Sequence, residues 1–107
     1  MDKREAVVQK KLMDRLTQEF PNIYIRKIHQ TMYSHKGIPD LIFCLNGAFG
    51  AIEVKKTSGV PTKLQLRELD AIRHAGGIAL ICAGVEEIEN VISILKQKTI
   101  CASTPYY

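Results

Sequence analysis

With 107 residues, 46% of them apolar and 24% charged, the chain has the size and composition of one globular domain spanning 1–107, and its net charge of +4 permits nucleic-acid binding without establishing it. Cys44, Cys82 and Cys101 are widely spaced and form no C-x-x-C pair, which argues against a disulfide framework and against a zinc site. The sequence has no apolar leader and no run long enough to span a membrane, so we expect a soluble protein of the cytoplasm.

The first predicted element is a helix near the N-terminus. Apolar residues recur at every fourth position from Val8 to Leu16, which is the period of one helix face. Asp2 followed three residues later by Glu5 has the pattern of a capping box at the helix start. Pro21 ends the helix.

Three strands are predicted next. The segment 23–28 is rich in β-branched and aromatic residues, and a polar loop over 30–37 separates it from the following strand. Apolar runs at 39–45 and 48–55 flank Asn46-Gly47, a dipeptide typical of a two-residue hairpin turn because both positions need a positive φ.

The second half of the chain predicts a helix, a strand and a helix. The helix over 62–75 begins with a second capping box, Thr62-x-x-Gln65. The continuous apolar run 78–83 indicates a buried strand parallel to its neighbour, and the spacing within 88–95 indicates an amphipathic helix. We expect 99–107 to be a loosely ordered tail. The order α-β-β-β-α-β-α predicts an α/β domain, a mixed four-stranded sheet flanked by helices.

The hairpin register brings two acidic side chains together. When the turn occupies two residues, Asp40 lies directly opposite Glu53. Side chains alternate along a strand, so Lys55 shares the face of Glu53, whereas Ile52 and Val54 point the other way.

This arrangement predicts a metal-dependent site. Directly opposed Cβ atoms lie only about 4.5–5.5 Å apart, so two carboxylates there repel each other unless a cation lies between them. Mg²⁺ and Mn²⁺ prefer such hard oxygen ligands, and a lysine beside them could orient water and stabilise developing phosphoryl charge. The pattern indicates phosphodiester hydrolysis, although D…E-x-K also arises by chance among the charges of a solvated strand face.

Three sequence blocks resemble one nuclease family. They are Gly37-Ile38-Pro39-Asp40-Leu41-Ile42, Ala51-Ile52-Glu53-Val54-Lys55 and Thr62-x-x-Gln65. They resemble the virus-type replication-repair nuclease (VRR-NUC) branch of the PD-(D/E)XK superfamily, over a region from Glu5 to about Ala83. The resemblance implies a restriction-endonuclease-like core, Mg²⁺ or Mn²⁺ as cofactor and DNA as substrate, in a stand-alone, phage-type member that acts in the bacterial cytoplasm.

The resemblance also assigns roles to individual residues. Asp40 and Glu53 match the metal ligands, with the main-chain carbonyl of Val54 as a further ligand, and Lys55 matches the catalytic lysine. Glu5 matches an acidic residue near the metal, as an alternative to its capping role.

Gln65 matches a glutamine that lies close to the catalytic lysine, again beside a capping role. The segment 21–39 is free of acidic residues but contains Arg26, Lys27 and Lys36. Candidate DNA contacts are Gln9, His35, Lys36, Lys56 and Lys63; for His35, Lys36 and Lys56 a solvated surface position is the alternative.

The expected activity is that of a structure-selective endonuclease. Small stand-alone relatives resemble enzymes that cut four-way junctions, and a C₂ homodimer would supply the two symmetric cuts that a junction needs. The alternatives are a less selective nicking or flap nuclease that needs a partner, and a DNA-binding module without catalysis.

Overall fold

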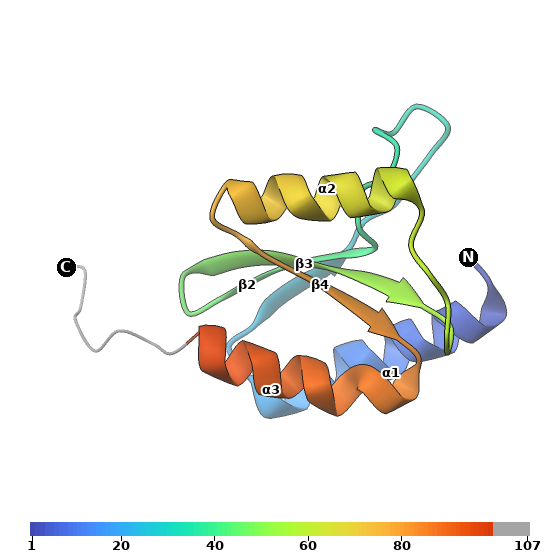
Figure 1. Cartoon of the computed structure of the whole chain (residues 1–107). Coiled ribbons are helices and arrows are strands. Elements are labelled where there is room, and N and C mark those ends of the chain that lie inside the picture. Colours follow the sequence, from blue (N-terminus) through green and yellow to red (C-terminus); the bar gives the residue numbers. More distant parts are fainter. Residues whose placement is uncertain (100–107) are drawn as a thin grey trace.

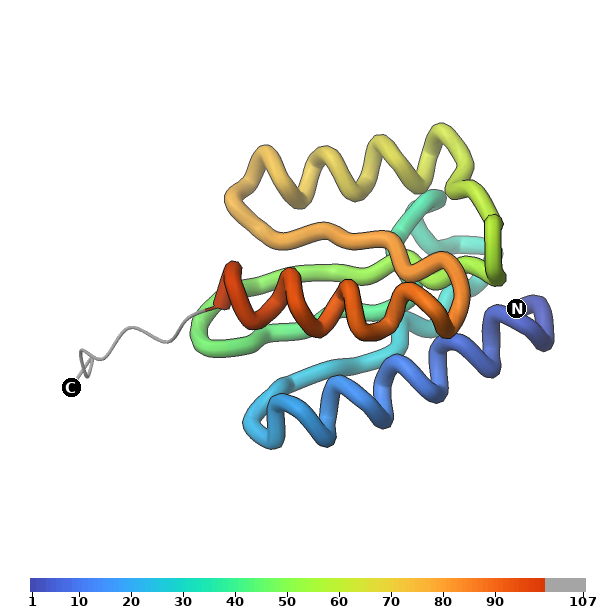
Figure 2. Tube along the Cα trace, turned by 60° about the horizontal axis from the view of Figure 1, so that its bottom comes forward, coloured from blue at the N-terminus to red at the C-terminus, as the bar shows by residue number. Residues whose placement is uncertain are grey.

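The computed structural model describes residues 1–99 and shows a four-stranded sheet between helices on both faces. The helices are α1 (Lys3–Glu19), α2 (Lys63–His74) and α3 (Ile88–Lys98), with a 3₁₀ turn η1 (Val85–Glu87) before α3. The strands are β1 (Tyr24–Lys27), β2 (Leu41–Leu45), β3 (Ala48–Lys55) and β4 (Ile78–Ala83). Helices α1 and α3 cover one face and α2 covers the other (Figure 1), and the tilted view in Figure 2 shows the same layers.

The sheet is mixed, as predicted. Its order is β1-β2-β3-β4, in which β1, β2 and β3 pair antiparallel and β4 pairs parallel to β3. The predicted bounds of β3 and β4 are those observed, and Thr62 and Gln65 form the predicted capping box of α2. Within residues 1–99, no helix is long and apolar enough to cross a membrane.

Several predicted boundaries differ from the structure. Strand β2 begins at Leu41, so Asp40 lies immediately before it, and β1 is shorter at both ends than the predicted 23–28. The turn η1 was not predicted. Thr99, expected in the tail, is buried, and its hydroxyl donates to the carbonyl of Leu95 one helical turn earlier. The remainder of the predicted tail, 100–107, lies outside the described residues.

The hairpin has the predicted register. Leu41 pairs with Ile52 and Leu45 with Ala48, and continuing this pairing by one step sets Asp40 opposite Glu53. Ile52 and Val54 are fully buried in the core cluster that includes the apolar stripe of α1. The opposite face of β3 carries Glu53 and Lys55, so the alternation along one strand separates the core from the polar face.

Gly50 marks a close contact within this core. A Cβ at this position would lie 2.2 Å from Cζ of Phe43 and 2.7 Å from the carbonyl oxygen of Ile78. We expect Gly50→Ala to lower the free energy of unfolding by about 1–3 kcal/mol, because the ring of Phe43 is buried and the backbone of β4 must shift. Urea denaturation would measure the loss; Gly47→Ala offers a comparison in which a Cβ meets no atom within 4 Å and only the positive φ of 84° opposes the change.

Candidate active site

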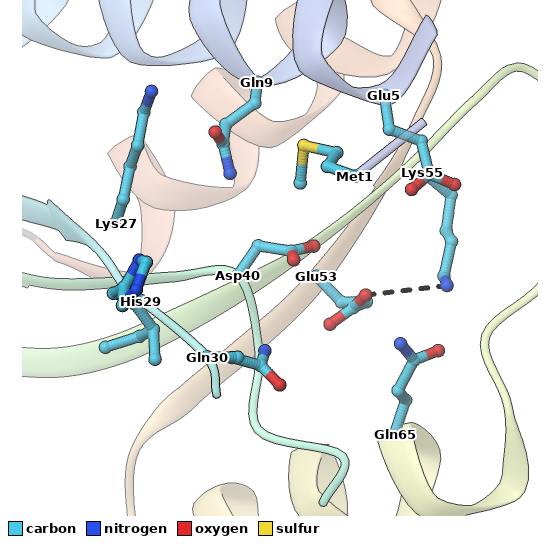
Figure 3. A pocket seen from close by; sticks show the side chains of 11 residues that line it. Met1, Glu5, Gln9, Lys27, His29, Gln30, Asp40, Glu53, Lys55 and Gln65 are labelled. Atoms are coloured by element: carbon cyan, nitrogen blue, oxygen red, sulfur yellow. Dashed lines mark ion pairs between the residues drawn. The ribbon is translucent and has the colours of Figure 1, made fainter. Parts of the chain in front are cut away.

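A cavity of about 490 Å³ opens between the starts of α1 and α2, beside the point where β2 begins. Figure 3 shows the polar side chains that converge on it from helices and strands far apart in the sequence. The residues that line the cavity are Met1, Glu5, Gln9, Lys27, Ile28, His29, Gln30, Asp40, Glu53, Lys55 and Gln65.

Asp40 is held by main-chain hydrogen bonds on both sides. Its carbonyl oxygen accepts the N–H of Ile28 at 2.8 Å, which extends the pairing of β1 with β2 by one step. Its side-chain Oδ2 accepts the N–H of Val54 at 2.8 Å. The side chain of Asp40 therefore bonds to the main chain of β3 just before β2 begins. Together the two hydrogen bonds fix the position of the carboxylate.

Glu53 is the buried acid of the site. Its side chain is 3% exposed, and its Oε2 lies 3.6 Å from Nζ of Lys55. Within the part of the chain that the structure describes, Oε1 of Glu53 is a buried side-chain oxygen without a hydrogen-bond partner. The pKa of Glu53 is raised from 4.5 to about 8, first by burial and then by the neighbouring Asp40, while Lys55 opposes the increase. A buried carboxylate with one free oxygen beside a second carboxylate is an arrangement that binding of a cation would stabilise.

The donor set fits a hard divalent ion such as Mg²⁺ or Mn²⁺. Asp40 and Glu53 provide carboxylate oxygens, and Glu53 retains an unpartnered one. Among residues 1–99, no group of three or more His, Cys, Asp or Glu side chains is placed to hold a metal ion. Mg²⁺ is often bound by one or two carboxylates, with water and substrate phosphate completing its coordination, so two acids are sufficient for such a site.

The two helices contribute three further predicted residues. Glu5 and Gln9 lie one turn apart on α1 and point into the cavity (Figure 3). Asp2 caps α1 by accepting the N–H of Arg4 at 2.7 Å, so the cap is made to the second helical residue and not to Glu5 as a capping box requires. On α2, Oε1 of Gln65 accepts the N–H of Thr62 at 2.8 Å, which leaves the amide nitrogen of Gln65 free to face the carboxylates.

The other predicted DNA contacts lie outside this cavity. His35 pairs with Glu68 at 3.2 Å, and Lys36 and Lys63 are exposed. Lys56 borders a separate hollow together with Arg4, so it points away from the cavity as the alternation along the strand predicted.

One wall of the cavity was missed by sequence reasoning. This wall consists of Lys27, the last residue of β1, and of Ile28, His29 and Gln30, which follow the strand directly. The available signal was the acid-free, basic segment that contains them, together with the antiparallel pairing that brings the end of β1 beside the start of β2.

Two solved domain structures resemble this chain over most of its length. No family model and no curated protein matches the chain. A solved structure described as "VRR_NUC domain" is 26% identical, covers 86% of this chain and 97% of its own, and superposes with a TM-score of 0.73. A second, described as "VRR_NUC domain protein", is 24% identical, with coverages of 91% and 88% and a TM-score of 0.65.

The fold is therefore that of a restriction-endonuclease-like α/β domain, with helices on both faces of a mixed four-stranded sheet. Both similarities support a VRR-NUC domain, the family that the G-I-P-D and I-E-V-K blocks resemble, and they support a nuclease-type function.

Proposed function

We propose that this protein is a Mg²⁺- or Mn²⁺-dependent DNA endonuclease that hydrolyses phosphodiester bonds at Asp40, Glu53 and Lys55. The observation that carries the proposal is the buried carboxylate of Glu53 beside Asp40. Its Oε1 has no hydrogen-bond partner among residues 1–99, and its Oε2 lies 3.6 Å from Nζ of Lys55. A structural role alone gives no reason to place the half-buried Asp40 beside the buried Glu53, because each acid raises the cost of ionising the other.

Each side chain has a distinct part in this chemistry. Asp40 and Glu53, with the Val54 carbonyl as a further candidate, would hold the cation, and the main-chain bond from Val54 keeps the Asp40 carboxylate aimed at it. When bound there, such an ion would supply Lewis acidity for phosphoryl transfer and for activation of water. Lys55 is placed to hold the attacking water or a phosphate oxygen, and to offset the negative charge that accumulates on phosphorus.

The α1 residues and Gln65 would complete the site. Glu5 and Gln9 approach the carboxylates from α1 and are candidates for water-mediated ligation and for substrate contact. Gln65 is fixed by its cap to Thr62, so its amide nitrogen can donate to a substrate phosphate without first being ordered.

The proposed substrate is branched DNA, with the four-way junction favoured. The preference for a junction rests on the family resemblance. The two-fold symmetry of a four-way junction favours a homodimer, because one symmetric dimer presents two active sites to the two strands that must be cut. Four further side chains lie outside the cavity, and we propose that they contact the phosphate backbone of DNA. Three of them are exposed and the fourth lines a separate hollow; they are His35, Lys36, Lys63 and, in the hollow, Lys56.

A cleavage assay tests this function. A labelled four-way junction would be compared with flap, duplex and single-stranded DNA of the same sequence, in Mg²⁺, in Mn²⁺ and in EDTA. Paired, metal-dependent cuts in the junction are expected. Equal cutting of all four substrates would remove the junction preference and leave a less selective nuclease. Tight DNA binding without cutting in either metal would show that the protein acts as a DNA-binding module and not as a nuclease.

The two roles of Gln65 can be separated with its capping partner. Thr62→Ala removes the capping bond that Oγ1 of Thr62 accepts from the N–H of Gln65 and keeps the Gln65 side chain, so it is expected to cost about 1 kcal/mol of unfolding free energy with little change in cleavage. Gln65→Ala removes the other bond of the capping box, from the N–H of Thr62 to Oε1, together with the side chain in the cavity, and is expected to slow cleavage by about tenfold or more at a similar loss of stability. Thermal unfolding and single-turnover cleavage, measured on both variants, would assign Gln65 to the helix cap alone if the two variants cleave equally.

A further inference from the structure

The loop between β1 and β2 presents two large apolar side chains to solvent. Met32 is 85% exposed and Tyr33 is 89% exposed, more than any other large hydrophobic residue among 1–99. Figure 1 shows this loop rising past the start of α2, away from the sheet. Folding alone does not account for exposing both side chains, because neither is packed against the core.

The exposed pair is held on an ordered turn. The N–H of Ser34 donates to the carbonyl of Thr31 at 3.0 Å, so Met32 and Tyr33 are the two central residues of a hydrogen-bonded β-turn. The side chains of Ser34 and Thr31 accept the N–H groups of Thr31 and Tyr33 at 2.8 and 3.2 Å. This turn, residues 31–34, therefore presents its two apolar side chains in a defined orientation.

The base of the loop is anchored to the rest of the domain. Gln30 donates from Nε2 to the carbonyl of Ile38 at 2.8 Å, which ties the two ends of the loop together. Gly37, with a φ of 87°, lies so close to α2 that a Cβ there would be 2.6 Å from the carbonyl oxygen of Leu64. His35 adds a contact to Glu68 on the next turn of α2. The turn 31–34 thus projects from a fixed base.

The position of the turn relates it to the candidate active site. Gln30, the residue before the turn, lines the cavity that contains Asp40 and Glu53. The segment 21–39 has no acidic residue, so its charge complements that of a nucleic-acid backbone. A strand whose phosphate lies in the cavity would therefore bring its neighbouring bases close to Met32 and Tyr33.

We propose that Met32 and Tyr33 form a base-stacking element that engages unstacked bases at a branch point beside the scissile phosphate. This inference rests on the proposed nuclease function and specifies how branched DNA is distinguished from duplex. Tyr33 offers an aromatic face to an unpaired base, and Met32 is of the side-chain type that proteins wedge between base steps. In continuous duplex the bases remain stacked on each other, so the turn gains no such contact.

Binding in the absence of cleavage tests the element. In an Asp40→Asn background, Tyr33→Ala is expected to weaken binding to a four-way junction by about tenfold and binding to duplex by less than about twofold. Tyr33→Trp retains an aromatic face and is expected to bind the junction as tightly as the parent. A 2-aminopurine at the branch point is expected to change fluorescence on binding of the parent and much less with Tyr33→Ala.

Phe49→Ala is the matched control, because Phe49 is a half-exposed aromatic residue at the opposite end of β3 from Glu53. Equal losses on junction and duplex, or none, would overturn the proposal, and so would loss of the homodimer in Tyr33→Ala, since the turn would then be an interface between copies of the chain. Wild-type cleavage separates the two hypotheses. If wild type cuts no DNA, the nuclease proposal fails, whereas normal binding and cutting by Tyr33→Ala removes only the stacking element.

Discussion

Asp40→Asn is expected to reduce metal-dependent DNA cleavage by about 10³-fold or more without unfolding the hairpin. The asparagine carbonyl can still accept the N–H of Val54, which Asp40 Oδ2 accepts at 2.8 Å, so the local structure retains its main-chain bond. The variant lacks only the negative charge that would hold the cation. Single-turnover cleavage of a labelled junction measures the loss.

Two further variants test whether the loss of cleavage is specific to the site: Lys55→Met within the cavity and the control Asp70→Asn outside it. Lys55→Met retains an unbranched apolar stem and removes the ammonium, and is expected to slow cleavage by about 10²–10³-fold. Asp70→Asn makes the same chemical change as Asp40→Asn on an exposed position of α2, where Asp70 pairs with Arg73 at 3.1 Å, and is expected to cleave normally. Full activity of Asp40→Asn would remove Asp40 from the reaction and with it the proposed metal site.

Without metal, the protein is expected to lose stability as pH rises from about 4.5 to about 8, because of Glu53. The pKa of this carboxyl is raised to about 8 in the folded chain, whereas its ordinary value is 4.5. Below pH 4.5 both states hold the proton. Between the two values the folded state alone holds it, so the free energy of unfolding falls with increasing pH, and above about 8 the buried carboxylate is ionised at full cost.

Glu53→Gln removes this titration. In EDTA at pH 9 the variant is expected to be more stable than wild type by on the order of 2 kcal/mol, with a smaller difference near pH 5. Urea denaturation across the pH range measures both chains. A constant difference between them at all pH values would show that Glu53 is not the group that titrates.

Added Mg²⁺ or Mn²⁺ is expected to reverse the trend in wild type. Binding requires the deprotonated carboxylate, so the midpoint of thermal unfolding should rise more on metal addition at pH 8 than at pH 6. Glu53→Gln should show little rise at either pH. An equal metal-induced rise in wild type and Glu53→Gln would place the ion elsewhere.

The sequence by itself determined the elements and the pairing of the two acids. Asn46-Gly47 fixes a two-residue turn, and a turn of known length sets the register in which Asp40 faces Glu53. The bounds of β3 and β4 and the cap at Thr62 were likewise predicted, because each depends on residues adjacent in the sequence. These features are local, and local stereochemistry determines them.

Only the tertiary structure showed what surrounds that pair. The approach of α1, which brings Glu5 and Gln9 toward the carboxylates, depends on tertiary packing. Residue spacing does not encode it, and only the family resemblance led us to expect Glu5 there. The burial of Glu53 and its unpartnered oxygen are also products of packing, since the sequence shows an acid but not the water excluded from it. Lys27, His29 and Gln30 reach the site because β1 pairs with β2. The periodicity of apolar residues predicts each strand, but it does not predict which strands pair.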